Sequence, residues 1–460
     1  MGYNALRIHH QDNLLVRKDA PDSLTMDSEM LDRLDYLFAA CRKRGIYVTT
    51  DLYVSRKLKA GDKIPEWIPK GHNHQMKSLV PISRAAMENW KEFARRWLCH
   101  RNPYTGLTWA EDPALYSVSL INENNLDYKY REEPELAKLY RKRYAAFLKE
   151  RYPGETDREK NSGESRRFLE FLYTLQQNAI QEQMAFLRNE IGLKALRTDV
   201  NMAGRIPLAL IRNRLDTVDD HKYHDHRRSA FKRWGLPYVY RQISSIGSLG
   251  NEVPLQLFAP RLFGKPFSVT EYKFCPPNRY RSEGGPLIGA YAALQGWDAL
   301  YQFAWAQSPL SVRKDRPLES FEMVNDPLAQ LSDRIVMFLF RRGDVKGADG
   351  SFAWNVPEDF WRTDQPIEYP LAFSRLGLLT RIGSVVGGKA PEGVRILSPA
   401  QASGGEALPD PALQALRRKL LQTGIAESST GEIRLDSKRK TLAIETSRTV
   451  SAVLASGDLK

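Results

Sequence analysis

Two hydrophobic patterns alternate along the first three quarters of the chain. Short apolar runs predict strands, and longer segments with apolar residues three and four positions apart predict helices. The expected strands are 5–10, 46–53, 115–121, 196–202, 215–218 (running into 219–224), 267–271 and 299–305. A helix or crossover follows six of these seven strands, and this alternation is typical of a parallel α/β fold.

The clearest helix signal spans residues 27–44, and Gly45 stands where a helix often ends. The apolar face of this helix consists of Leu31, Leu34, Phe38 and Cys41. Further helices are expected near 86–98, 286–295 and 327–341, and residues 135–190 predict two long helices separated by a polar break at 153–165.

The segments that follow the strands distinguish an open doubly wound sheet from a closed (β/α)8 barrel. An open doubly wound sheet usually carries a glycine-rich phosphate turn, and the sequence has none. Polar residues stand instead at the carboxyl ends of the strands, which favours a (β/α)8 TIM barrel. Seven strands leave one missing, and it should be the first, because a strand rich in functional side chains follows residue 1 at once. We therefore expect an N-terminally incomplete barrel, either because the chain begins inside a longer parent protein or because its start was misassigned.

The pattern changes after residue 345, which separates an expected catalytic domain, 1–345, from a smaller region, 346–460. Residues 399–411 are small, polar and contain Pro and Gly, and they predict a linker or surface loop. Antiparallel strands are expected at 430–435, 441–446 and 449–454. A sheet this small is marginal alone, so we expect it either to pack on the barrel or to begin a sandwich.

Composition narrows the class of protein. The 460 residues are 42% hydrophobic and 27% charged, and no run approaches the ~20 apolar residues of a membrane helix. Three cysteines cannot form a disulfide framework. The first residues, MGYNALRIHH, form no signal peptide. The location stays open: secreted or periplasmic if a leader is missing from the chain, otherwise cytoplasmic. The oligomeric state is not indicated.

The net charge of +13 indicates a basic surface. Basic residues are scattered among acidic ones, and no nucleic-acid motif accompanies them, so nucleic acid ranks low as a partner. Four lysines of the 55–85 loop (Lys57, Lys59, Lys63 and Lys70) could favour acidic glycans.

The carboxyl ends of parallel barrel strands converge on one face. The residues there are Arg7, His9, His10, Asp51, Tyr53, Asn122, Glu123, Asn201, His221, Tyr223, Glu271 and Trp305. Glu123 and Glu271 end the expected fourth and seventh of eight strands, which lie on opposite sides of the mouth. Two facing carboxylates are what glycoside hydrolysis requires: one donates a proton to the leaving oxygen, and the other attacks or activates water.

In this order and spacing, residues 1–342 resemble the clan A retaining glycoside hydrolases, and in particular their cellulase-like members. The resemblance implies that Glu123, in the pair Asn122-Glu123, is the acid/base and that Glu271 is the nucleophile. Two departures are the absent first strand and Asn124, which stands where many members have Pro.

The same resemblance implies that Arg7 holds the nucleophile, that His221 and Tyr223 form a His-x-Tyr motif, and that Trp305 is an aromatic platform under the sugar. The expected substrate-binding residues are Arg7, His9, Asn122, Asn201, His221, Tyr223 and Trp305. The implied activity is hydrolysis of a β-linked poly- or oligosaccharide by double displacement, with no cofactor and no metal.

Elementary electrostatics supports this division of roles. Arg7 beside Glu271 favours the ionised carboxylate that a nucleophile needs. Glu123 is expected nearer apolar surface, which would raise its pKa. Carboxyl groups about 5–5.5 Å apart indicate retention, whereas about 6.5–9.5 Å indicates inversion.

Two other functions remain open. The barrel could bind carbohydrate without hydrolysing it. A metal-dependent hydrolase could use the cluster His221, His224 and His226 together with Asp219, Asp220 and Asp225, since these residue types bind transition metals.

Overall fold

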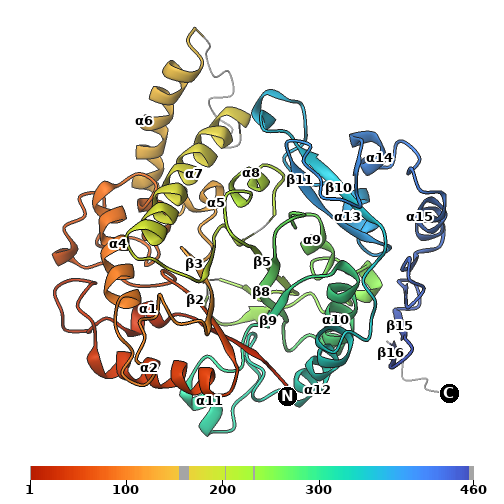
Figure 1. Ribbon diagram of the computed structural model, residues 1–460, viewed down its shortest axis with the longest axis horizontal. Coiled ribbons are helices and arrows are strands. Elements are labelled where there is room, and N and C mark those ends of the chain that lie inside the picture. The colour runs from red at the N-terminus through yellow and green to blue at the C-terminus, as the bar shows by residue number, and fades with distance from the viewer. Residues whose placement is uncertain (1, 155–164, 203, 232–233, 455–460) are drawn as a thin grey trace.

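Parallel strands form the centre of the computed structural model (Figure 1), which describes residues 2–154, 165–202, 204–231 and 234–454. Seven such strands occur within these ranges: β1 (Ala5–Ile8), β2 (Tyr47–Asp51), β3 (Leu115–Ser119), β4 (Leu196–Thr198), β5 (Val218–His224), β8 (Phe267–Phe274) and β9 (Ala299–Gln302). They pair in the orders β1-β2-β3-β4 and β5-β8-β9. A parallel bridge between Met202 and His221 joins the two sets, and β9 contacts β1. The expected barrel is confirmed. That a further strand precedes β1 stays a prediction.

The pairing of β5 with β8 is interrupted at the functional end of the barrel. Asp220 pairs with Val269, but the next residue, His221, pairs with Glu271. Thr270 is therefore the extra residue of a β-bulge, a device that redirects side chains in barrels. The bulge places His221 directly beside Glu271.

Helices cover the outside of the barrel. The predicted helix at 27–44 is α2 (Ser28–Lys43), capped by the Asp27 side chain, which accepts a hydrogen bond from the Met30 N–H. Its predicted apolar face is buried. Gly45 has a φ of +67°, a conformation that glycine adopts at low cost.

The remaining predicted helices are also present. They are α4 (Arg84–Leu98), α6 (Pro134–Arg151), α7 (Arg166–Asn189), α10 (Gly284–Gln295) and α12 (Pro327–Val336), which continues as η4 (Met337–Arg341). The predicted break between α6 and α7 lies largely outside the described residues, at 155–164. Both helices extend away from the barrel at the top of Figure 1.

Short elements occupy the loops. The helices are α1 (Gln11–Leu14), α3 (Met76–Leu79), α5 (Leu126–Lys129), α8 (Leu208–Arg212), α9 (Leu255–Phe258) and α11 (Pro309–Arg313), and the strands β6 (Arg228–Ser229) and β7 (Tyr238–Val239) form a hairpin. Within the described ranges, no helix has the length and apolar character that crossing a bilayer requires.

The region after residue 345 contains two small sheets. The first, which the sequence did not predict, is parallel in the order β11-β10-β12: β10 (Ser351–Val356), β11 (Arg381–Val386) and β12 (Val394–Leu397). The second is antiparallel: β13 (Ile425–Glu427), β14 (Ile433–Asp436), β15 (Thr441–Glu445) and β16 (Val450–Leu454). Its last three strands match the predicted ones.

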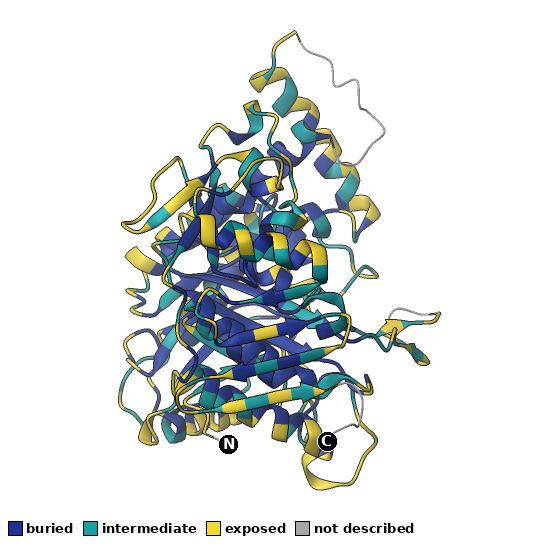
Figure 2. Ribbon diagram, turned by 90° about the vertical axis from the view of Figure 1, so that its right-hand side faces the viewer, coloured by how far each residue is buried: buried dark blue, intermediate teal, exposed yellow. Residues whose placement is uncertain are grey.

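Helices accompany these sheets: α13 (Leu371–Leu376), α14 (Pro399–Ser403) and α15 (Pro411–Thr423). The predicted linker at 399–411 therefore contains α14, whose capping box is formed by Ser398 and Gln401. Figure 2 shows α15 and the antiparallel strands on this side of the molecule, with buried residues beneath them.

One hydrophobic core joins this region to the barrel. A cluster of buried residues extends from Ile206, in the second half of the barrel, to Ile444 in β15. In addition, the Phe263 N–H donates to the Ser384 carbonyl of β11, and the Ser384 N–H donates to the Arg261 carbonyl. The C-terminal region therefore packs on the barrel, which is one of the two arrangements that the sequence left open.

Candidate active site

Charged side chains hold Glu271 in place at the bulge of β8. Nη1 of Arg7 lies 2.5 Å from Oε1 of Glu271, and Nη2 of Arg7 lies 2.8 Å from Oδ1 of Asp51. The Tyr223 hydroxyl donates a hydrogen bond to Oε2 of Glu271. Both oxygens of this buried carboxylate therefore have a donor, which fixes its orientation.

The charges around Glu271 favour its ionised form. Burial by itself would raise the pKa of Glu271, but the positive charges of His221 and Arg7 outweigh that effect and hold the pKa below its ordinary value. An ionised carboxylate is the form that a nucleophile needs; the role of Glu271 stays a prediction.

Glu123 follows β3 in a strained backbone conformation with a φ of +48°, which is uncommon for a residue with a side chain. The Glu123 N–H donates to Oδ1 of Asn201 at 2.8 Å, and Nδ2 of Asn201 donates to Oδ2 of Asp219 at 3.0 Å. Asn201 thus stabilises the turn that presents the Glu123 side chain to the pocket.

His221 lies between the two glutamates. Its Nδ1 is 3.2 Å from Oε1 of Glu123 and 3.6 Å from Oε2 of Glu271. Its Nε2 is 2.8 Å from Oγ1 of Thr270.

The partners of His221 determine its protonation. The Thr270 hydroxyl donates to Asp219 at 2.7 Å, so it accepts a hydrogen bond from Nε2–H of His221. Nδ1 faces two carboxyl groups, and it donates a hydrogen bond to Glu123 when the ring is protonated. Burial would lower the pKa of His221, but the charge of Glu271 and the hydrogen bond to Glu123 raise it. The two glutamates therefore favour the protonated form of His221.

The two carboxyl groups are close together. One carboxyl oxygen of Glu123, one of Glu271 and a ring nitrogen of His221 all lie within 4.8 Å of one another. This spacing is close to the short carboxyl separation of retaining glycosidases and below the about 6.5–9.5 Å of inverting ones.

The charge state of Glu123 differs from the sequence-based expectation. Burial would raise the pKa of Glu123, but the hydrogen bond from His221 and the charge of Lys77 bring it below its ordinary value. The expected rise in this pKa is therefore wrong for the free protein. The physical reason is that cations, rather than apolar surface, surround the carboxylate.

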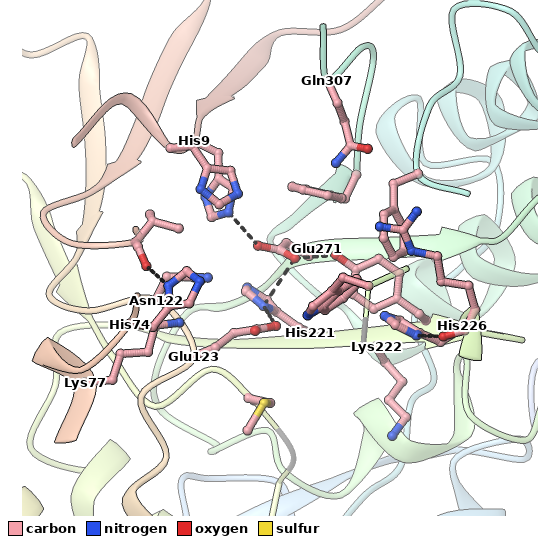
Figure 3. A pocket seen from close by; sticks show the side chains of 18 of the residues that line it. His9, His74, Lys77, Asn122, Glu123, His221, Lys222, His226, Glu271 and Gln307 are labelled. Carbon is pink, nitrogen blue, oxygen red and sulfur yellow. Dashed lines mark hydrogen bonds and ion pairs between the residues drawn. The ribbon is translucent and has the colours of Figure 1, made fainter. Parts of the chain in front are cut away.

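Both glutamates open into one pocket of about 680 Å³ (Figure 3). Of the expected substrate-binding residues, His9, Asn122, His221 and Tyr223 line it. Nδ1 of His9 lies 2.9 Å from Asp51, and Oδ1 of Asn122 accepts a hydrogen bond from Arg7 at 3.0 Å. These contacts orient both side chains beside Glu271.

Three expected substrate-binding residues have other positions. Asn201 is fully buried and acts through the backbone of Glu123. Arg7 lies behind Glu271 and does not line the pocket. Trp305 is 47% exposed and also lies outside the pocket lining, whereas Phe303 lines it. Since β9 ends at Gln302, the aromatic residue at its end is Phe303.

The histidine cluster proposed as a metal site does not come together. Nε2 of His224 lies 3.0 Å from the Ile243 carbonyl, Nδ1 of His226 lies 2.8 Å from the Arg227 carbonyl, and His221 faces the two glutamates. Among the described residues, the group with metal-ligand spacing is Glu123, His221 and Glu271. The Arg7 guanidinium against Glu271 disfavours a cation there.

Sequence reasoning gave Thr270, Lys77 and Lys129 no role at the site and considered Asp219 only as a metal ligand. Asp219 and Thr270 connect Asn201 and His221 into one network, and both belong to strands that the pattern had located. Lys77 and Lys129 line the pocket from α3 and α5. These helices have four residues each, too few for a periodic signal.

No protein-family model matches the chain, and no curated protein matches it. Among solved structures, an endo-beta-1,4-mannanase from Thermotoga petrophila is 14% identical, with 76% of this chain and 75% of that chain covered and a TM-score of 0.49. An exo-beta-1,4-mannosidase from Opitutaceae bacterium strain TAV5 is 15% identical, with 98% and 77% covered and a TM-score of 0.46. A family 5 xyloglucanase from Paenibacillus pabuli is 11% identical, with 74% and 87% covered and a TM-score of 0.40. At these identities the likeness assigns no family.

Proposed function

We propose that this protein is a retaining glycoside hydrolase that cleaves β-linked poly- or oligosaccharides. The observation that carries the proposal is the pair Glu123 and Glu271, with carboxyl oxygens within 4.8 Å in one pocket. Their surroundings differ, because Arg7 and Tyr223 hold Glu271 while His221 faces Glu123. The solved structures of similar shape are also glycoside hydrolases.

In the first step, a carboxylate oxygen of Glu271 attacks the anomeric carbon and the bond to the glycosidic oxygen breaks. Glu123 gives its proton to that oxygen, and the product is a glycosyl ester on Glu271. The proton that Glu123 needs is available from Nδ1 of His221, 3.2 Å away. Neutralising Glu271 as an ester removes the negative charge that raises the pKa of His221, which favours release of this proton.

In the second step, Glu123 takes a proton from water, and the water oxygen attacks the anomeric carbon. The ester bond breaks, and Glu271 leaves as a carboxylate. Arg7 and Tyr223 stabilise the returning charge, because both already donate to the two oxygens of Glu271.

Azide rescue distinguishes the nucleophile, Glu271, from the acid/base, Glu123. The wild type, Glu271→Gly and Glu123→Gly are assayed on aryl β-glucoside, galactoside, mannoside and xyloside with and without azide. Azide should rescue both variants. It replaces the nucleophile in Glu271→Gly and gives the α-glycosyl azide, whereas it attacks the glycosyl ester in Glu123→Gly and gives the β-glycosyl azide.

Other outcomes identify other functions. A folded wild type that binds glycans and cleaves none of the substrates would indicate a carbohydrate-binding barrel. Activity that chelators abolish and a divalent metal restores would indicate a metal-dependent hydrolase. The same azide product from both variants would overturn the assigned roles.

A further inference from the structure

Two lysines in the pocket wall have no part in the mechanism above. Lys77 comes from α3 and Lys129 from α5, and both line the pocket that contains Glu123. Lys77 is 4% exposed and Lys129 is 8% exposed. Figure 3 shows Lys77 and His74 on one side of the glutamates and His226 on the other. Burying two ammonium groups is costly unless each has an anionic partner.

Within the part of the chain that the structure describes, Lys129 has a direct ion-pair partner and Lys77 has none. Nζ of Lys129 lies 3.1 Å from Oε1 of Glu132. Among the described residues, the Lys77 side chain has no hydrogen-bond partner and no direct ion-pair partner, although the charges of Glu123, Glu132 and Glu271 act on it from farther away. Burial and the neighbouring charge of Lys129 lower the pKa of Lys77 to about 8. The pocket therefore contains a buried lysine amine that has no direct ion-pair partner among the described residues.

The loop lysines considered from the sequence do not explain this charge. Lys57, Lys59, Lys63 and Lys70 do not line the pocket. Nζ of Lys59 donates to the carbonyl groups of Arg17 and Ala20 instead. The positive charge beside Glu123 comes from the short helices α3 and α5.

We propose that Lys77, with Lys129 beside it, binds an anionic substituent of the substrate, so that the preferred glycan carries a carboxylate or a sulfate ester. The inference rests on the proposed function, since it names the substrate class of the same pocket. A carboxylate or sulfate can accept hydrogen bonds from Nζ of Lys77, and such charge-assisted bonds are about twice as strong as neutral ones.

An acidic substrate would also prepare Glu123 for catalysis. The charges of Lys77 and Lys129 lower the pKa of Glu123 in the free protein, which opposes its role as an acid. An anion bound to Lys77 offsets this charge and raises the pKa of Glu123, so Glu123 takes up a proton more readily. A neutral glycan lacks this effect, and the pocket therefore selects acidic glycans in both binding and proton transfer.

Kinetics with matched substrates test the proposal. The substrates are 4-nitrophenyl β-glucoside, its C6 carboxylate (the glucuronide) and its 6-sulfate, with the mannose series in parallel. The proteins are the wild type, Lys77→Met, Lys77→Arg and the control Lys57→Met, which removes an exposed lysine outside the pocket. The readout is the ratio of kcat/KM for the acidic substrate to kcat/KM for the neutral one.

In the wild type, kcat/KM should be about 10- to 100-fold higher for the acidic substrate than for the neutral one. This factor corresponds to the free energy of one hydrogen bond to a charged group. Lys77→Met should abolish this preference, Lys77→Arg should retain part of it, and Lys57→Met should leave it unchanged. Comparing the carboxylate substrate with the sulfate substrate shows which of these two anionic groups Lys77 binds. A neutral preference in the wild type, or an unchanged ratio in Lys77→Met, would overturn the proposal.

Binding separates this proposal from the proposed hydrolysis. Calorimetry on Glu271→Gln measures the affinity for glucuronate-containing, sulfated and neutral oligosaccharides. If no substrate is cleaved, tighter binding of the acidic ligands that Lys77→Met removes would still support the anion site, while hydrolysis itself would be contradicted. Equal affinity for acidic and neutral ligands would overturn the anion site even if hydrolysis is observed.

The melting temperature of Lys77→Met tests whether Lys77 has a purely structural role. Replacing an unpaired buried ammonium with an apolar side chain of similar length should leave the melting temperature unchanged or raise it. A lowered melting temperature in this variant would show that Lys77 serves the fold and would contradict a reserved binding group.

Discussion

Nδ1 of His221 lies 3.2 Å from Oε1 of Glu123. His221 is buried, its other ring nitrogen contacts Thr270, and its pKa is raised, so we expect the proton that Glu123 must deliver to be shared with the imidazole. A histidine and a glutamate that interact this closely titrate as a pair.

The pH dependence of catalysis tests this shared proton. Activity should fall as the pH rises through the pKa at which the pair loses its last proton. In the wild type this pKa is set mainly by His221, whose own pKa is raised above 6.5. In His221→Gln, Glu123 alone holds the proton, so the basic limb of the kcat/KM profile should move to lower pH. His100→Gln is the control, because His100 lies outside the pocket lining and contacts Asp35 rather than a glutamate. An unchanged basic limb in His221→Gln would contradict the shared proton.

Arg7 controls the acidic limb of the same profile. Glu271 must be ionised to attack, and the charge of Arg7 lowers its pKa. In Arg7→Met the pKa of Glu271 should rise, so the acidic limb should move to higher pH. Loss of this cation also removes the ion pairs to Asp51 and Glu271, which should lower the free energy of unfolding by about 3–5 kcal/mol. Arg7→Lys keeps the charge and should shift the limb less; a larger shift in Arg7→Lys than in Arg7→Met would contradict this role.

Asn201 is a positioning residue for Glu123. In Asn201→Ala the Glu123 N–H loses its acceptor, which should lower the free energy of unfolding by about 1–3 kcal/mol. Since the side chain does not touch the pocket, kcat should fall while KM stays nearly constant. Asn201→Asp keeps an acceptor and serves as the comparison. A raised KM with an unchanged kcat would mean that Asn201 binds substrate, as the sequence first suggested.

We expect the substitutions Phe303→Ala and Trp305→Ala to differ in their effect on KM. Phe303 lines the pocket, and an aromatic face contributes about 0.5–1.5 kcal/mol beyond its area, so Phe303→Ala should raise KM by about 2- to 10-fold. Trp305→Ala should leave KM unchanged. A larger effect of Trp305→Ala would restore the platform assigned from the sequence.

The sequence predicted the barrel because each parallel strand is a short apolar run whose polar end carries a side chain of the site. Glu123, Glu271, His221 and Tyr223 were found in this way. Trp305 was misplaced because the end of β9 lies three residues earlier than the apolar run suggested. The pKa of Glu123 was predicted in the wrong direction because Lys77 and Lys129 belong to four-residue helices, whose position depends on tertiary packing.

In the C-terminal region, too, only part of the structure could be predicted from the sequence. Strands β14 to β16 alternate apolar and polar residues and were predicted. The parallel strand β10 is buried at almost every position, and such a run cannot be distinguished from a buried helical segment by periodicity alone.

Trapping the covalent intermediate tests the central claim most directly. The wild type is incubated with a 2-deoxy-2-fluoro β-glycoside that carries an activated leaving group, and the intact protein and its peptides are analysed by mass spectrometry. Double displacement predicts the mass of one fluoroglycosyl group on the peptide that contains Glu271 and no added mass in Glu271→Gln. An unlabelled wild type that cleaves the parent substrate with inversion, or a label on another residue, would contradict Glu271 as the nucleophile.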